Sequence, residues 1–134
     1  MENQFERTEL LLGKDAIQKL KNAHVAVFGV GGVGGFVVEA LVRSGVGEID
    51  VIDKDTVSLS NINRQIIALY STVGQPKVEV IKNRALDINP NSLTKSLIIS
   101  PAIINPATDG TNAILPGTGL SPSGAGILIA PSFE

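Results

Sequence analysis

The sequence predicts an α/β fold, a Rossmann-like parallel sheet preceded by N-terminal helices. Three features predict it: a β-branched run, HVAVF, at residues 24–28; a glycine-rich turn, GVGGVGG, at 29–35; and a second apolar run, EIDVID, at 48–53. A helical pattern lies between the turn and the second run. Strand, glycine turn, helix and strand therefore follow one another within about 30 residues, which is typical of a right-handed βαβ unit.

The N-terminal elements are two short surface helices and a buried strand. Residues 15–21 place Ala16, Ile17 and Leu20 at helical spacing, and residues 7–12 can form a preceding helix. Residues 24–28 are short, apolar and followed by glycine, so we expect a parallel strand buried on both faces. His24 opens this strand and is interpreted as a boundary residue rather than a catalyst.

Two longer helices and two further strands follow. The helix expected over residues 33–42 ends at SGVG, and the helix expected over residues 77–88 ends before Pro90. Their apolar stripes are Phe36, Val37, Ala40 and Leu41 in the first, and Val78, Ile81, Ala85 and Ile88 in the second. Residues 48–53 form the second strand, and residues 93–99 can supply a third.

Composition favours a packed domain and excludes several kinds of chemistry. The 134 residues are 43% hydrophobic with a net charge of −2, which supplies a core and gives no indication of nucleic-acid binding. The sequence has no cysteine, which excludes disulfides, Cys-ligated zinc and thioester catalysis. No signal peptide or membrane-length apolar run is present, so we expect a cytoplasmic protein that does not enter a membrane.

The glycine turn has the spacing of a nucleotide-binding site. Gly29, Gly31 and Gly34 form G-x-G-x-x-G between a strand and a helix, and with Gly32 they let backbone N–H groups approach phosphate oxygens. Asp53 follows Gly34 by 19 residues, where a carboxylate can accept hydrogen bonds from ribose hydroxyls. The alternative is that the glycines only permit close packing and that Asp53 caps a turn.

Two cations downstream favour ATP over NAD. Arg64 lies in the loop after the strand that ends at Asp53, and Lys77 stands at a helix start. A guanidinium and an ammonium suit a triphosphate and the charge that builds on a leaving pyrophosphate. Taken singly, Arg64 could be a surface ion pair with Asp55 or Asp53, and Lys77 a solvated lysine in the first helical turn.

These segments together resemble the adenylating family of ubiquitin-activating type, the ThiF/MoeB/HesA-like proteins. The resemblance rests on GVGGVGG, VIDKDTVSLSNINRQ, STVGQPKVEV and RALDINP, and it covers residues 5–91. FERTELLLG and SNINRQIIALYSTVGQPKVEV look most like the tRNA threonylcarbamoyladenosine dehydratase branch. This resemblance implies an enzyme that uses ATP to activate the carboxylate of a threonylcarbamoyl group on a tRNA adenosine, which then cyclises.

The resemblance also implies roles for particular residues. Gly32 and its neighbours would contact the nucleotide, Asp53 would hold the ribose, and the phosphates would face Asn61, Arg64 and Lys77. Arg7 would reach into the site of the other protomer of a homodimer. Mg²⁺ would accompany ATP, although the D-A-x-D-like motif that carries the family's metal aspartate is absent from this sequence.

The composition changes near residue 91, where the resemblance also stops. Residues 1–91 hold 21 of the 24 charges, whereas residues 92–134 hold 5 of the 7 prolines and the stretch LPGTGLSPSGAG. We therefore expect residues 1–91 to be the N-terminal part of a ThiF-type nucleotide-binding domain, truncated, and residues 92–134 to be an irregular Pro/Gly/Ser-rich tail. A chain of this kind is expected to bind nucleotide weakly and to turn over poorly.

Three other functions stay open. The same nucleotide site serves family members that adenylate the C-terminus of a ubiquitin-like sulfur-carrier protein, although the lack of cysteine argues against sulfur transfer through this chain. An NAD-binding oxidoreductase domain is favoured if Arg64 and Lys77 lie far from the crevice. A binding module without chemistry would keep the nucleotide fingerprint alone.

Overall fold

A parallel sheet with helices, as the sequence predicts, forms the described part of the chain. The computed structural model describes residues 3–97 and 126–130. The sheet has the order β3-β2-β1-β4, with β1 (His24–Phe28) parallel to β2 (Glu48–Ile52) and β2 parallel to β3 (Leu93–Leu97). The Rossmann-like fold class is therefore confirmed.

The fourth strand runs against the others. β4 (Gly126–Ala130) pairs antiparallel with β1, with Phe28 opposite Gly126 and His24 opposite Ala130. It comes from the segment expected to be irregular, most of which lies outside the described residues. Residues 98 and 99 of the expected third strand also lie outside them.

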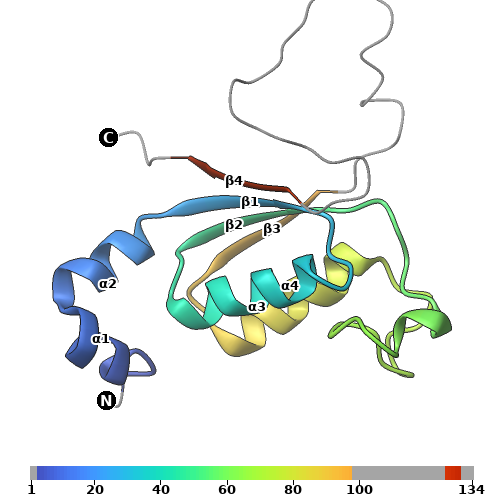
Figure 1. Cartoon of the computed structure of the whole chain (residues 1–134), viewed down its shortest axis with the longest axis horizontal. Coiled ribbons are helices and arrows are strands. Elements are labelled where there is room, and N and C mark those ends of the chain that lie inside the picture. Colours follow the sequence, from blue (N-terminus) through green and yellow to red (C-terminus); the bar gives the residue numbers. More distant parts are fainter. Residues whose placement is uncertain (1–2, 98–125, 131–134) are drawn as a thin grey trace, which may run out of the picture.

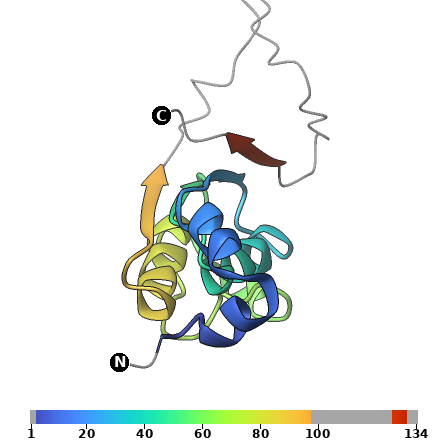
Figure 2. The same ribbon diagram turned by 90° about the vertical axis from the view of Figure 1, so that its left-hand side faces the viewer.

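Two helices cover one face of the sheet. α3 (Gly34–Ser44) and α4 (Lys77–Ile88) lie side by side beneath β1, β2 and β3 (Figure 1). α1 (Glu6–Leu12) and α2 (Lys14–Lys21) precede β1 and lie at the end where β1 begins (Figure 2). A short 3₁₀ turn, η1 (Leu59–Asn61), lies in the loop after β2. No helix in the described ranges is both long and apolar enough to cross a bilayer.

The core lies between the helices and one face of the sheet. Alternate residues of β1 and β2 are buried there, namely Val25, Val27, Ile49 and Val51. The expectation that β1 is buried on both faces is wrong for the described part of the chain: Phe28 is exposed and His24 and Ala26 are half-buried. The reason is that α3 and α4 cover only one of the two faces.

The helix stripes agree with the sequence in α4 and differ in α3. In α4 the buried apolar residues include Val78, Ile81 and Ala85, as expected. In α3 the buried side chains are Val38 and Val42, beside two buried glycines at the start of the helix, whereas Phe36 is 54% exposed. Val37 and Leu41 of the predicted stripe are partly buried against the core, so the prediction is correct for these two residues and wrong for Phe36. Glycine lacks the side chain that marks a stripe, so the sequence pattern did not include Gly34 and Gly35.

An ion-pair cluster joins the two covering helices. Glu39 of α3 accepts hydrogen bonds from Arg84 of α4 at 2.5 and 3.1 Å and from Arg43 one turn along α3 at 2.8 and 3.0 Å. The hydrogen bond from Arg84, with help from Arg43, lowers the pKa of Glu39. Because Glu39 is 13% exposed, the cluster is more strongly held than a surface pair.

We predict that Glu39→Gln lowers the free energy of unfolding by about 1 kcal/mol at neutral pH. The pKa of Glu39 is lower in the folded chain, so its stabilisation is full above the unfolded pKa and is lost as pH falls through the folded pKa. The difference between wild type and variant should therefore shrink in acid. Urea unfolding at several pH values measures this, with the exposed Glu6→Gln as control; a difference that does not change with pH contradicts the assignment.

Candidate nucleotide site

The glycine turn connects β1 to α3 at the carboxyl end of the strand. Gly29 has φ +83°, in the left-handed region that favours glycine, and its N–H donates to the carbonyl of Ile52 at 2.7 Å. α3 begins at Gly34, so the positive end of its dipole faces the turn. This is the local geometry that binds phosphate groups.

Asp53 fixes the position of this turn. Its Oδ2 accepts a hydrogen bond from the Val30 N–H at 2.7 Å, and its Oδ1 accepts one from the Asp55 N–H at 2.8 Å. The carboxylate thus joins the glycine turn to the loop after β2. Each carboxylate oxygen has a second lone pair, so these bonds leave acceptor capacity for ribose hydroxyls.

Gly31 and Gly32 lie against the loop that carries Arg64. A Cβ built on Gly31 would be 3.7 Å from Nε2 of Gln65, and one on Gly32 would be 3.8 Å from the carbonyl oxygen of Arg64. Both are ordinary van der Waals distances, so the surrounding protein has room for a methyl group there. A ligand that approaches the backbone would give glycine its advantage at these positions.

Lys77 is buried at the start of α4. Its side chain is 8% exposed and its Nζ lies 3.2 Å from Oδ2 of Asp55, whose own side chain is 57% exposed. The backbone N–H of Lys77 also donates to the carbonyl of Asp55 at 3.0 Å. The burial of the Lys77 side chain shows that the alternative of a solvated lysine in the first helical turn is wrong. A β-bridge between Thr56 and Pro76 holds the segment of Asp55 against the start of α4.

Arg64 and Asn61 come from the loop between β2 and α4. Arg64 is exposed and donates from Nη1 to the Ser60 carbonyl at 3.1 Å and to Oδ1 of Asn63 at 2.9 Å. In the described part of the chain Arg64 forms no ion pair with Asp53 or Asp55, which was the alternative considered from the sequence. Asn61 is buried and its Oδ1 accepts from the Ser58 N–H at 3.0 Å, so it shapes the η1 turn.

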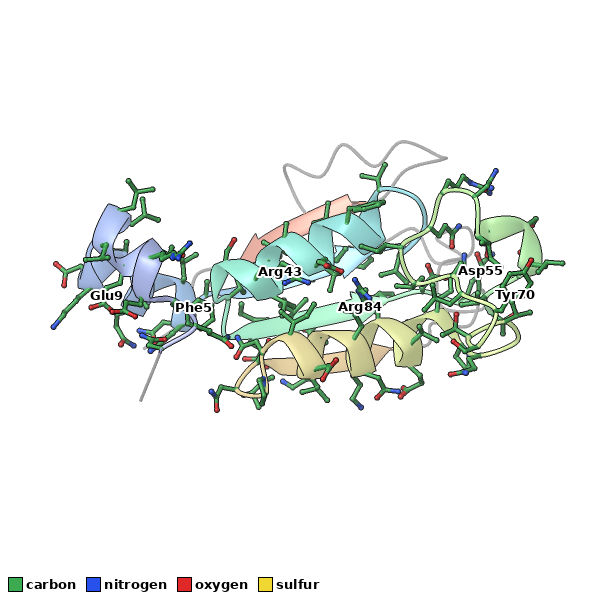
Figure 3. The ribbon with its side chains drawn as sticks, turned by 90° about the horizontal axis from the view of Figure 1, so that it is seen from below. Phe5, Glu9, Arg43, Asp55, Tyr70 and Arg84 are labelled. Atoms are coloured by element: carbon green, nitrogen blue, oxygen red, sulfur yellow. The ribbon has the colours of Figure 1, made fainter. Side chains whose placement is uncertain are left out.

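Arg7 is distant from this site within one chain. It belongs to α1, and Figure 3 shows Glu9 of α1 and Asp55 at opposite ends of the described structure. The remaining predicted residues belong to the glycine turn, the end of β2, the loop after it and the start of α4. A role for Arg7 therefore requires a second chain.

Two residues of the site carried no predicted role. Asp55, which the sequence suggested only as an alternative ion-pair partner of Arg64, is instead the partner of Lys77. Gln65 is 7% exposed, and its Oε1 has no hydrogen-bond partner among the residues that the structure describes. A single buried polar residue in a loop belongs to no repeating pattern of apolar residues, so the sequence pattern could not single it out.

A strand, a glycine turn, a helix N-terminus and a carboxylate at the next strand end define a Rossmann-like α/β domain. Residues 5–101 match the ThiF family, and the chain belongs to this family. The resemblance stated from the sequence motifs is confirmed, and the match extends beyond residue 91 to include β3. β3 is five residues long, and none of the motifs that carry the resemblance includes it.

The chain is similar in sequence to a dehydratase and to an adenylyltransferase. It is 60% identical over 90 residues to tRNA threonylcarbamoyladenosine dehydratase of Bacillus subtilis, covering 67% of this chain and 35% of that protein. It is 39% identical over 79 residues to the sulfur carrier protein adenylyltransferase of Thermus thermophilus, covering 59% of this chain and 29% of that protein. The chain spans about a third of the length of the curated relatives it matches.

A solved structure is similar in fold and sequence. The Escherichia coli tRNA N6-threonylcarbamoyladenosine dehydratase in complex with ATP has a TM-score of 0.70 and 43% sequence identity. The similarity covers 72% of this chain and 40% of that chain.

We predict that Gly29→Ala lowers the free energy of unfolding by about 1–2 kcal/mol, because an alanine at φ +83° is strained. Gly31→Ala should change it by less than about 0.5 kcal/mol, since its Cβ has room. Urea unfolding of both variants without nucleotide measures the difference. Equal losses in the two variants would contradict this account of the turn.

Proposed function

We propose that this chain binds ATP at the carboxyl ends of β1 and β2 and contributes to adenylation of a carboxylate, that of a threonylcarbamoyl group on tRNA adenosine. Lys77 carries the proposal: it is a buried cation at the start of α4, balanced by the exposed carboxylate of Asp55. An anion bound at the carboxyl ends of β1 and β2 can replace water around this ion pair. The 43% identity to a dehydratase solved with ATP supports the same conclusion.

Each predicted residue has a role in this proposal. The backbone N–H groups of Gly31 and Gly32 and the start of α3 bind phosphate oxygens. Asp53 accepts hydrogen bonds from the ribose. Lys77, Arg64 and Asn61 face the polyphosphate, with the two cations neutralising the charge that grows on departing pyrophosphate.

The proposed step is attack of a carboxylate oxygen on the α-phosphorus. The bond to the bridging oxygen of the β-phosphate breaks, pyrophosphate leaves, and an acyl adenylate forms. The neighbouring amide nitrogen or oxygen then attacks the acyl carbon, the bond from that carbon to the AMP oxygen breaks, and AMP leaves while the amide proton is released to water. A carboxylate is already a nucleophile at neutral pH, so positioning and charge neutralisation supply most of the rate.

Mg²⁺ and a second protomer complete the proposal. Magnesium would arrive with the triphosphate and keep several of its water ligands. Arg7 on α1 would reach the site of a partner chain in a homodimer, where its guanidinium can contact the triphosphate. We place the protein in the cytoplasm, where ATP and tRNA are available.

A sulfur-carrier protein is the second candidate substrate. It is favoured by the identity to the Thermus thermophilus adenylyltransferase, and it needs the same acyl adenylate. ATP–pyrophosphate exchange measured with threonylcarbamoylated tRNA or with a carrier protein distinguishes the two. Because the D-A-x-D-like motif is absent from this sequence, we expect exchange by this chain alone to be slow with either substrate.

We predict that ATP stabilises the chain and that NAD does not. At a hundredfold excess over its Kd, ATP should add about 2.7 kcal/mol to the free energy of unfolding, which raises the Tm by several degrees. Asp53→Asn and Lys77→Met should remove most of this increase, because the first weakens ribose binding and the second removes the buried cation. Thermal unfolding with and without each nucleotide measures it.

The matched control for Lys77→Met is Lys82→Met, which makes the same substitution in the second turn of α4. This variant should keep the full response to ATP. Equal protection of wild type, Asp53→Asn and Lys77→Met by ATP would place the nucleotide elsewhere, and stronger protection by NAD would favour the oxidoreductase alternative.

A further inference from the structure

The face of the sheet opposite α3 and α4 carries a cluster of polar side chains. Figure 1 shows α3 and α4 on one side of the sheet, and the buried residues of β1 and β2 alternate with half-buried ones, so the residues between them lie on the opposite face. On this face the first residue of β1, His24, pairs in register with the first residue of β2, Glu48, and Asp50 follows two residues later. An imidazole and two carboxylates therefore share one corner of the sheet.

The three side chains converge. His24 Nε2 lies 2.8 Å from Asp50 Oδ2, and His24 Nδ1 lies 3.8 Å from Glu48 Oε2. One potential ligand atom from each of the three lies within 4.8 Å of the others, and this is the one such group of three or more found among residues 3–97 and 126–130. We propose that His24, Glu48 and Asp50 form a binding site for a divalent transition-metal ion.

An unsatisfied oxygen supports the proposal independently of the distances. Asp50 Oδ1 is inaccessible to solvent and has no hydrogen-bond partner in the described part of the chain. Leaving a carboxylate oxygen buried without a partner is unfavourable. A cation at the cluster, bound by a small rotation of Asp50, would give this oxygen a partner.

The charges around the cluster also favour a cation. Lys95 on β3, which lies beside Asp50 in the register, forms an ion pair with Glu48. Two carboxylates against one ammonium leave a net negative charge when His24 is neutral, which is the form of imidazole that binds metal.

The donor set selects the kind of ion. One imidazole nitrogen and two carboxylate oxygens suit Zn²⁺ and other first-row divalent ions and leave a position for water, whereas Mg²⁺ prefers oxygen ligands alone. The cluster begins at the amino ends of β1 and β2. The glycine turn follows the other end of β1, about 13 Å along the strand, so this site is separate from the proposed nucleotide site.

A substitution of Lys95 gives a specific test of the metal site, because the Lys95 ammonium competes with a metal ion for Glu48. Isothermal titration of the untagged 134-residue chain with ZnCl₂ should give one ion per chain. His24→Gln and Asp50→Asn should weaken binding by more than about tenfold, since even loss of an outer-shell partner costs about 10- to 100-fold. Lys95→Met should tighten it, whereas Glu6→Gln, which removes a distant carboxylate on α1, should leave it unchanged.

Circular dichroism checks the fold of each variant. If His24→Gln fails to fold, Lys95→Met still tests the site, because it keeps all three ligands, and X-ray absorption of the zinc-loaded wild type should show one nitrogen among oxygen ligands. Absence of zinc binding overturns the proposal. So does binding that none of these substitutions changes, or a zinc shell without nitrogen.

Discussion

The proposed site depends on the two backbone hydrogen bonds that the carboxylate of Asp53 accepts. One carboxylate holds the Val30 N–H of the glycine turn and the Asp55 N–H of the loop after β2. The turn and the loop belong to different strand ends, and a charged acceptor gives such bonds about twice the strength of neutral ones. Asp55 in turn holds Lys77, so a single side chain at the end of β2 organises the glycine turn, the loop after β2 and the start of α4.

Much of the fold could be predicted because its elements are local. The pattern at residues 24–53 contains a strand, a turn and a helix in the order that a parallel sheet requires, and α4 was predicted with the bounds that the structure gives it. β4 could not be predicted in the same way. A run such as GILIA shows that a strand is favourable, but its partner and direction depend on contacts with β1, about a hundred residues earlier in the sequence.

The candidate site, like the fold, could be predicted only in part. Gly29 and Asp53 have positions fixed by spacing, and the structure brings them together. The burial of Lys77 and the role of Asp55 depend on the path of residues 54–76, a loop without regular periodicity. The exposure of Phe28 was missed for a different reason. An apolar strand sequence predicts burial, and only the positions of α3 and α4 show that these two helices cover just one face of the sheet.

The Glu39 cluster has a consequence for any ligand at the proposed nucleotide site. By clamping α3 to α4, it sets the separation of two helix starts that face the same end of the sheet, one following the glycine turn and the other carrying Lys77. A binding surface that is already preorganised loses little conformational entropy when it is occupied. The ion pair between Glu39 and Arg84 can therefore strengthen ligand binding at the proposed nucleotide site without contacting the ligand.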